Sequence, residues 1–158
     1  MQLIEQHSAG SSAGFLLWHA NLRWQRTLTD VLAPMGLTHV QFVVLSTVWW
    51  LGRAGDAPRQ GEVAEHGGLD TAMTSQVTNA LVAKGWIVRG QDPSDGRVSL
   101  LYLSPSGREL TELAVVSLDE AERAFFAAAG EQAGDRTRLI EVLRLLADRD
   151  ERGSRQSD

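Results

Sequence analysis

Apolar positions recur every three or four residues along most of the chain, a spacing that predicts helices with one or two buried faces. From Phe15 to Ala33 the apolar residues occupy two adjoining faces, so this helix is expected to pack between two partners. Pro34 and Gly36 break the pattern. A second, strongly apolar helix opens at Thr38-His-Val-Gln41, where each end of a capping box satisfies a free backbone N–H, and it runs through Leu51.

Two short helices joined by a tight, glycine-containing turn come next, and this is the pattern of a helix-turn-helix. The first spans about Gln60 to His66 and stops at Gly67-Gly68. The second runs from Thr71 to Lys84, with Asp70 as N-cap because its carboxylate can accept from the amides of the first turn. Its inward stripe comprises Met73 or Thr74, Val77 and Leu81, which leaves Thr71, Ser75, Gln76 and Asn79 facing outward.

A β-hairpin is predicted directly after the second short helix. The β-prone runs Trp86 to Arg89 and Val98 to Leu103 flank the turn sequence Asp92-Pro-Ser-Asp95-Gly-Arg97, which is typical of a solvent-exposed tip. Arg97 at such a tip has little core to contact, and Asp95 is close enough in sequence to brace it with an ion pair. The hairpin indicates the wing of a winged helix-turn-helix, with Arg97 a candidate for entering a DNA minor groove.

The C-terminal part is predicted to form two long helices. Ser104-Pro105 starts the first, with serine as cap and proline at the first helical position, and it continues to Gly130. The second spans about Asp135 to Arg149. One winged module cannot bury these helices together with the first one, so a subunit interface is expected. The predicted fold is mainly α with a small β-hairpin, divided into an N-terminal dimerisation helix (1–36), a winged helix-turn-helix (37–108), C-terminal dimerisation helices (109–150) and a disordered tail (151–158), with residues 1–13 frayed.

The composition, 43% apolar and 22% charged residues in a chain of 158, is that of an ordinary globular protein. No window approaches the roughly 18 apolar residues of a membrane span, and the N-terminus lacks the charged-then-apolar pattern of a signal peptide. A cytoplasmic protein without a membrane partner is expected. The chain has no cysteine, which excludes disulfides, thiolate metal sites and thiol-based redox sensing.

The net charge of −5 is unevenly distributed. Residues 1–58 and 59–108 are each neutral, and the whole excess lies in residues 109–158, with seven basic and twelve acidic residues. Because phosphate neutralisation usually supplies much of DNA affinity, a neutral DNA-binding segment has to gather its cations on one face. The neutral charge also permits an alternative, in which the winged fold contacts another protein and binds no DNA.

An enzyme is not indicated. His7, His19, His39 and His66 are scattered, with no pair at metal-ligand spacing, and no glycine-rich phosphate loop is present. We therefore predict no catalytic residues, no metal and no cofactor.

Several motifs occur in order at characteristic spacings: Gly36-Leu37-Thr38-x-x-Gln41-Phe42-x-x-Leu45, Glu62-Val-Ala64-Glu, Met73-Thr74-Ser75-Gln76-Val77-x-x-x-Leu81, Lys84-Gly85-Trp-Ile-Val-Arg89, and Asp92-Pro-x-Asp95-x-Arg97 leading into Leu103-Ser-x-x-Gly107-x-x-Leu110. Together they resemble the MarR family of transcriptional regulators over roughly Phe15 to Leu146. The resemblance implies a homodimer with interlocking terminal helices, a recognition helix in the major groove and a wing in the minor groove. It also implies a small aromatic or phenolic ligand, which members of the family often bind between the dimerisation and DNA-binding parts of the subunit.

The chain departs from the family's pattern at three places. Arg59, after Pro58, stands where the family commonly has a hydroxyl residue that caps the first motif helix. The recognition helix has no arginine near Gln76, and Gly96 stands where a second wing arginine is usual. Each change removes a phosphate or base contact, so the departures concern operator affinity or identity and not the fold.

The candidate DNA contacts differ in chemistry. Gln76 and Asn79 have the amide geometry that can bridge N6 and N7 of adenine, while Ser75 and Thr71 suit phosphates or a thymine methyl. Arg89 at the base of the wing is either a phosphate contact or an ordinary surface arginine. The proposed DNA-binding set is Thr71, Ser75, Gln76, Asn79, Arg89, Asp95 and Arg97.

Five tryptophans are many for a chain of this size. Trp24 and Trp86 are interpreted as core. A ligand pocket between the first, second and fifth helices could draw on Trp18, His19, Phe42, Trp49 and Arg53, with Arg53 available for a carboxylate; the alternative is that these residues are ordinary core. The sequence thus predicts a ligand-responsive, homodimeric transcriptional repressor that binds a pseudo-palindromic operator in double-stranded DNA.

Overall fold

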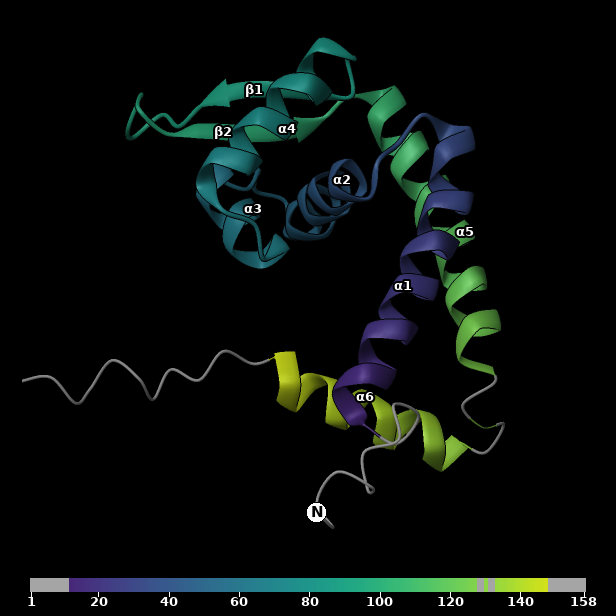
Figure 1. Cartoon of the computed structure of the whole chain (residues 1–158). Helices are drawn as coiled ribbons and strands as arrows, with labels where there is room; N and C mark the ends of the chain where they lie inside the picture. The colour runs from purple at the N-terminus through teal and green to yellow at the C-terminus, as the bar shows by residue number, and fades with distance from the viewer. Residues whose placement is uncertain (1–11, 128–129, 131–132, 148–158) are drawn as a thin grey trace, which may run out of the picture. The chain divides into compact units, whose positions relative to one another are not determined.

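The computed structural model describes residues 12–127, 130 and 133–147, with the side chains of 133–135 left out. The predicted tail (151–158) and most of the segment predicted to be frayed (1–13) lie outside these ranges. The described part consists of α-helices and one two-stranded antiparallel sheet, which confirms the predicted fold class (Figure 1). The chain divides into two compact units, Met1–Ala121 and Glu122–Asp158.

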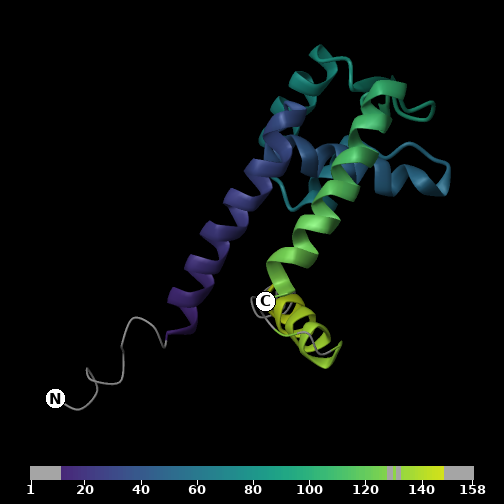
Figure 2. The same ribbon diagram turned by 90° about the vertical axis from the view of Figure 1, so that its right-hand side faces the viewer.

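The first two helices follow the sequence prediction closely. Helix α1, Ala13–Leu32, is one continuous helix (Figure 2), and a 3-10 turn leads from it to Gly36, whose φ of 70° lies in the left-handed region that favours glycine. Helix α2, His39–Leu51, begins with the predicted capping box: Gln41 N–H donates to Thr38 Oγ1, and Thr38 N–H donates to Gln41 Oε1, each at 3.2 Å. Side-chain capping of this kind determines where the helix starts.

The helix-turn-helix is formed by α3, Gln60–Gly67, and α4, Thr71–Ala83. Asp70 caps α4 as predicted, since its Oδ1 accepts from the Met73 N–H at 2.7 Å. The following hairpin pairs β1, Ile87–Gln91, with β2, Ser99–Leu103, along their whole lengths, and it extends away from the helices to an open tip (Figure 1).

The sheet has a third contributor that the sequence did not predict. The Leu101 N–H donates to the Pro58 carbonyl at 2.9 Å, and Arg59 forms an isolated antiparallel bridge with Leu100. The backbone just before α3 therefore lies along the outer edge of β2. As a result the start of α3 is tied directly to the wing.

The core of the first unit is formed by side chains from the end of α1, from α2, α3 and α4, from the base of the hairpin, and from the middle of α5 (Pro105–Ala127). Burial of apolar side chains from all these elements is the main force that holds the helix-turn-helix against the wing. The buried apolar residues of this cluster are Leu28, Leu32, Leu37, Val44, Leu45, Val48, Val63, Leu81, Ile87, Leu101, Ala114 and Leu118.

Helix α5 starts in very close contact with the chain before β1. Ser104 Oγ accepts from the Gly107 N–H at 3.0 Å and donates to the Gly85 carbonyl at 2.7 Å, so the predicted serine cap is present. A Cβ atom at Gly107 would lie 2.0 Å from the Trp86 carbonyl oxygen. Only glycine permits this approach of helix to backbone.

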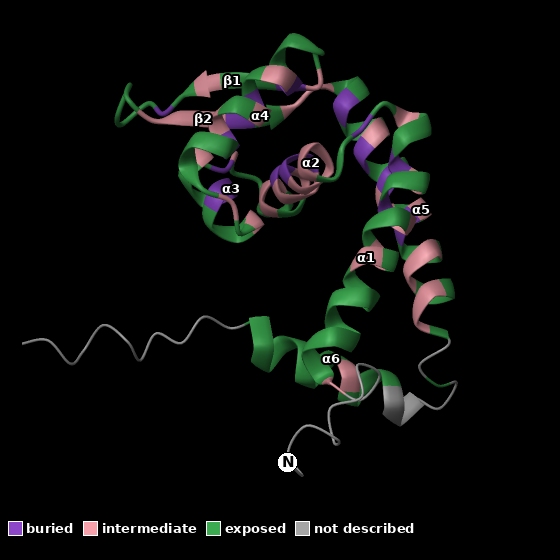
Figure 3. Cartoon of the chain, viewed as in Figure 1, coloured by how far each residue is buried: buried purple, intermediate pink, exposed green. Residues whose placement is uncertain are grey.

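Large apolar side chains are exposed on the helices that are predicted to dimerise. The N-terminal half of α1 is largely exposed (Figure 3), and Trp18 is 59% exposed. On α5, Val116 is 67% exposed, and on α6, Ala133–Ala147, Leu145 is 77% exposed. Each of these helices therefore carries large apolar side chains that the described subunit leaves in contact with solvent.

No single described helix is long and apolar enough to cross a membrane, although the segments Ala13–Met35 and His39–Ala54, bent by 76° to each other, would qualify together on length and composition.

Candidate nucleic-acid interface

The outward face of α4 is polar and uncharged. Thr71, Gln76 and Asn79 are exposed and Ser75 is partly buried, as the helical spacing predicted. The inward stripe begins with Thr74, which is fully buried, whereas Met73 is 42% exposed. A buried threonine is tolerated at this position because its Oγ1 donates to the Asp70 carbonyl at 2.8 Å.

A hydrogen-bonded cluster connects α4 to α3 and to the wing. Arg89, on β1, donates from Nη1 to Asn79 Oδ1 at 2.7 Å and from Nη2 to Gln60 Oε1 at 3.1 Å. The three side chains come from β1, α4 and α3. Arg89 is thus held over the outward face of the helix-turn-helix, and two of its nitrogens are engaged within the protein.

The base of the wing is braced by the carboxylate of Asp92, which is almost completely buried. Its Oδ1 accepts from the hydroxyl and the backbone N–H of Ser94 at 2.6 and 2.8 Å, and its Oδ2 pairs with Arg59 Nη2 at 2.8 Å. The Ser94 hydroxyl, the Ser94 N–H and then Arg59 lower the pKa of Asp92 from 3.8 to about 2, although burial opposes them. Asp92 is therefore an anion at neutral pH and holds the wing to the start of α3.

Arg97 lies at the exposed tip, but the predicted ion pair with Asp95 is not formed. Asp95 Oδ1 instead accepts from the backbone N–H of Arg97 at 3.0 Å, and the Val98 N–H closes the turn onto the Asp95 carbonyl at 2.9 Å. An aspartate in a tight turn prefers the N–H two residues ahead because its short side chain reaches it without strain. Within the described ranges the Arg97 guanidinium has no protein partner and is available to a ligand.

Three residues of this interface were not predicted from the sequence: Arg59, Gln60 and Asp92. Arg59 was noted only as a missing helix cap. A guanidinium has no acceptor atom, so the Arg59 side chain cannot cap the helix. The Arg59 backbone N–H donates to Glu62 Oε2 at 2.7 Å, and the Arg59 side chain binds Asp92 instead. The sequence carried no local signal for this contact, because Arg59 and Asp92 come from different segments of the chain.

A groove of about 590 Å³ runs between α3 and β2. Arg59 and Arg97 line it together with Glu62 and Glu65, so its charge is mixed. Arg97 contributes its charge from the wing and Arg59 from the start of α3. Other lining residues are Gln60, Gly61, Val98 and Ser99.

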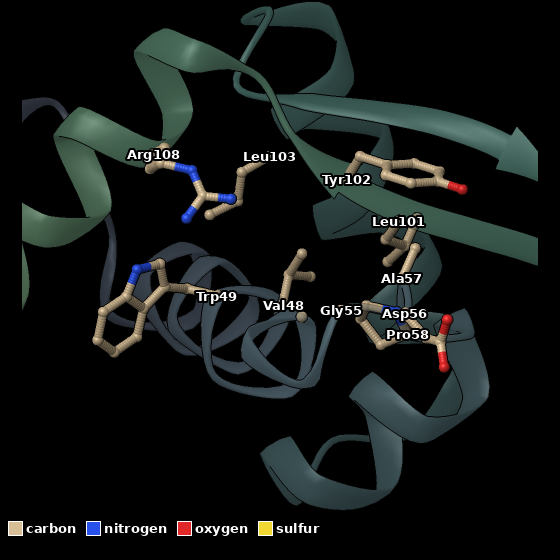
Figure 4. A pocket seen from close by; sticks show the side chains of 11 residues that line it. Val48, Trp49, Gly55, Asp56, Ala57, Pro58, Leu101, Tyr102, Leu103 and Arg108 are labelled. Carbon is tan, nitrogen blue, oxygen red and sulfur yellow. The ribbon is translucent and has the colours of Figure 1, made fainter.

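A separate pocket of about 160 Å³ opens between the end of α2, the loop before α3, β2 and the start of α5 (Figure 4). Trp49, Leu103 and Arg108 lie at one end, and Asp56 lies at the other. In the part of the chain that the structure describes, the Arg108 guanidinium has no carboxylate partner. An unpaired cation beside an indole and aliphatic side chains suits a small planar anion.

Neither the groove between α3 and β2 nor the pocket with Arg108 is lined by all five residues that were predicted to form a ligand site. Arg53 lies between Trp49 and Trp50, its guanidinium carbon 5.2 Å from each ring centroid. Trp49 also lines the pocket with Arg108, a residue that was not among the predicted ligand contacts. Trp18 and His19 are exposed on α1, and Phe42 packs against the core.

No group of three or more histidine and acidic side chains suited to hold a metal ion is found among the described residues.

Comparison with known proteins agrees with this geometry. Residues 37–99 match the MarR family. The HTH-type transcriptional regulator YdcH of Bacillus subtilis is 37% identical over 145 residues, which are 89% of this chain and 99% of that protein. BpsR of Bordetella bronchiseptica, whose DNA binding is regulated by 6-hydroxynicotinic acid, has a TM-score of 0.78 at 28% identity, over 91% of this chain and 98% of that one.

The repressor CouR of Rhodococcus jostii, in a complex with a 23-mer DNA duplex, has a TM-score of 0.76 at 28% identity. The match covers 88% of this chain and 94% of CouR. The chain belongs to the MarR family of winged helix-turn-helix transcriptional regulators.

Proposed function

We propose that the chain is a homodimeric repressor that inserts α4 into the major groove of its operator and the wing tip into the adjacent minor groove. The observation that carries the proposal is the polar face of α4, formed by Thr71, Ser75, Gln76 and Asn79, next to an exposed and unpaired Arg97 on a braced hairpin. Amides and hydroxyls offer directional hydrogen bonds to base edges, and an arginine suits the negative potential of a narrow minor groove.

The exposed apolar surface of α1, α5 and α6 supports the homodimer, because a monomer would leave it in water. A two-fold symmetric dimer presents two copies of α4 in opposite directions. The operator is then a pseudo-palindrome with half-sites about 10 bp apart, one turn of B-DNA.

Selection of binding sites from a random DNA pool, followed by anisotropy titrations in increasing salt, tests this function. Arg97→Ala should weaken operator binding by about 1–3 kcal/mol and make the salt dependence shallower. Gln76→Ala should relax base preference at one position of each half-site, because an amide carries no charge. Failure of the purified dimer to bind any duplex would favour the alternative of a protein-binding winged module.

A small aromatic acid is the proposed effector, and the pocket of Figure 4 is its proposed site. A cavity of roughly 150 Å³ holds one benzene ring, so this pocket has the size for a single substituted ring. Arg108 can take a carboxylate, and Asp56 at the opposite end can accept from a ring hydroxyl or N–H. That 6-hydroxynicotinic acid regulates DNA binding by the relative BpsR supports an effector of this class.

Quenching of tryptophan emission by hydroxylated aromatic acids measures this binding, because Trp49 lines the pocket. Arg108→Ala should abolish the response to acids. Arg53→Ala serves as the matched comparison, because Arg53 lies against the indole rings of Trp49 and Trp50 outside this pocket. If Arg53→Ala abolishes the response and Arg108→Ala does not, the acid binds at the other cation.

A further inference from the structure

The amide of Asn79 has a defined orientation on the outward face of α4. Arg89 Nη1 lies 2.7 Å from the Asn79 side chain. A guanidinium has only donors, so the asparagine atom that faces it must be the carbonyl oxygen. The NH₂ group lies at the other end of the planar amide. The short distance is typical of a charge-assisted hydrogen bond, which holds this orientation more firmly than a neutral one would.

Gln60 holds the same guanidinium from the opposite side. Its Oε1 accepts from Arg89 Nη2 at 3.1 Å, so Arg89 is bound to α3 and α4 at once. A forked side chain is needed for this, because its two donors leave the head group in fixed directions. Arg89 is therefore held beside Asn79 and is restrained from extending toward a phosphate.

Arg89 and Asn79 together form a surface rich in donors and poor in acceptors. The guanidinium keeps unused N–H groups and a positive charge, and the asparagine keeps its NH₂ group. In the major groove guanine presents two adjacent acceptors, N7 and O6, whereas adenine presents an N7 acceptor beside an N6 amino donor. The adenine amino group would meet the oxygen that Arg89 already binds, next to a cation that disfavours another donor.

We infer that Arg89 is a specificity-determining residue: it turns the preference of Asn79 from adenine, which a free asparagine pairs with, to guanine. The inference rests on the proposed function, in which α4 lies in the major groove. Arg89 acts here as a positioning residue for Asn79. This assignment differs from both expectations drawn from the sequence, a phosphate contact and an ordinary surface arginine.

Sequencing of DNA selected from a random pool tests the inference, using the full-length dimer and two variants. The wild-type protein should select guanine at one position of each half-site. Arg89→Met, which keeps side-chain length but donates nothing, should shift that position toward adenine by about fivefold or more, because the freed amide can bridge N6 and N7. The double variant Arg89→Met with Asn79→Ala should show no preference there.

Asn79→Asp provides a second variant, which does not depend on the fold tolerating the loss of Arg89. The carboxylate keeps the bond to Arg89 but replaces the outward donor with an acceptor. Guanine preference should disappear, and cytosine, whose N4 is a donor, should gain. Arg97→Met is the matched control for loss of a cation, since it should weaken all sequences alike and leave that position unchanged.

Two outcomes separate this inference from the proposed function. If Arg89→Met weakens binding uniformly and every position keeps its preference, or if Asn79→Asp still selects guanine, Arg89 does not set specificity although the protein binds DNA. If the wild-type dimer selects no sequence at all, the proposed function itself fails.

Discussion

At the scale of single residues, Asp92 uses both carboxylate oxygens: Oδ1 is bonded to Ser94 within the wing, and Oδ2 pairs with Arg59 at the start of α3. Its pKa of about 2 lies below the ordinary 3.8, so the folded state binds the ionised form preferentially. The resulting stabilisation is complete above about pH 4 and is lost as the pH falls toward 2. The contact between the wing and the start of α3 should therefore loosen only in strong acid, as Asp92 becomes protonated near pH 2.

Asp92→Asn should lower the free energy of unfolding at pH 7, because an amide cannot pair with Arg59 as an anion does. The difference from wild type should shrink as the pH is lowered from about 4 to about 2, where wild-type Asp92 becomes protonated. Urea unfolding at a series of pH values measures this. A difference that stays constant over the whole range would show that the charge of Asp92 does not contribute.

Thr78 on α4 carries a buried hydroxyl with no partner in the described structure. A buried hydroxyl without a hydrogen bond costs about 1–3 kcal/mol, and valine has nearly the same shape. Thr78→Val should thus raise the free energy of unfolding by about 1 kcal/mol, measured by urea unfolding. Thr74→Val is the control and should lower it, because the Thr74 hydroxyl is bonded to the Asp70 carbonyl. Equal shifts in both variants would refute the argument.

At the scale of elements, the helices and strands were predictable because local signals mark their ends. The capping box at Thr38, the Asp70 cap and the Ser104 cap all act within one turn of chain. The pairing of residues 58 and 59 with β2 was not predictable, since it joins segments 41 residues or more apart in sequence and follows no hydrophobic pattern. Long-range contacts between polar side chains, such as Arg59 with Asp92, escape prediction for the same reason.

The candidate site was predicted in part. Periodicity alone placed Gln76 and Asn79 on the outward face of α4, because burial of Thr74, Thr78 and Leu81 turns the helix in that direction. Periodicity could not show that Asn79 is bound by Arg89, because the partner belongs to another element. The pocket residue Arg108 was missed because its neighbours come from α2 and β2.

Gly107→Ala tests the contact between α5 and the segment before β1. The added methyl group would lie 2.0 Å from the Trp86 carbonyl oxygen, so helix and strand would have to separate. We expect a loss of about 1–3 kcal/mol or more in the free energy of unfolding, measured by thermal and urea unfolding.

Gly61→Ala is the matched control for this substitution. Gly61 lies in α3, and a Cβ atom there meets nothing within 4 Å. Alanine is the better helix former, so this variant should gain about 0.5–1 kcal/mol. A Gly107→Ala protein as stable as wild type would mean that the close approach is not required.

At the scale of the whole molecule, the apolar helices are expected to determine the oligomeric state. Leu145→Glu changes a side chain that is already 77% exposed, so it should leave the fold of the subunit intact and shift the dimer to monomer. Light scattering coupled to size exclusion measures the mass, and operator binding should fall with it. Val88→Glu, on the exposed face of β1, is the control and should remain dimeric.

Deletion of residues 131–158 removes the whole C-terminal helix and also tests its role in dimerisation. The truncated protein should be a monomer or an aggregate and should not bind DNA. A truncated protein that stays a binding-competent dimer would contradict the assignment of the C-terminal helix to the interface.

The pairing of residues 58 and 59 with β2 also bears on solubility. A hairpin that stands out in solvent normally offers two unpaired edges, and such edges recruit strands from other molecules. Here β1 covers one edge of β2 and the chain before α3 covers part of the other, with a proline that cannot donate. The other edge of β1 is five residues long and contains Arg89 and Gly90, and neither residue favours the addition of a further strand. The exposed hairpin therefore offers less unpaired backbone on which strands of other molecules could add, which should limit aggregation.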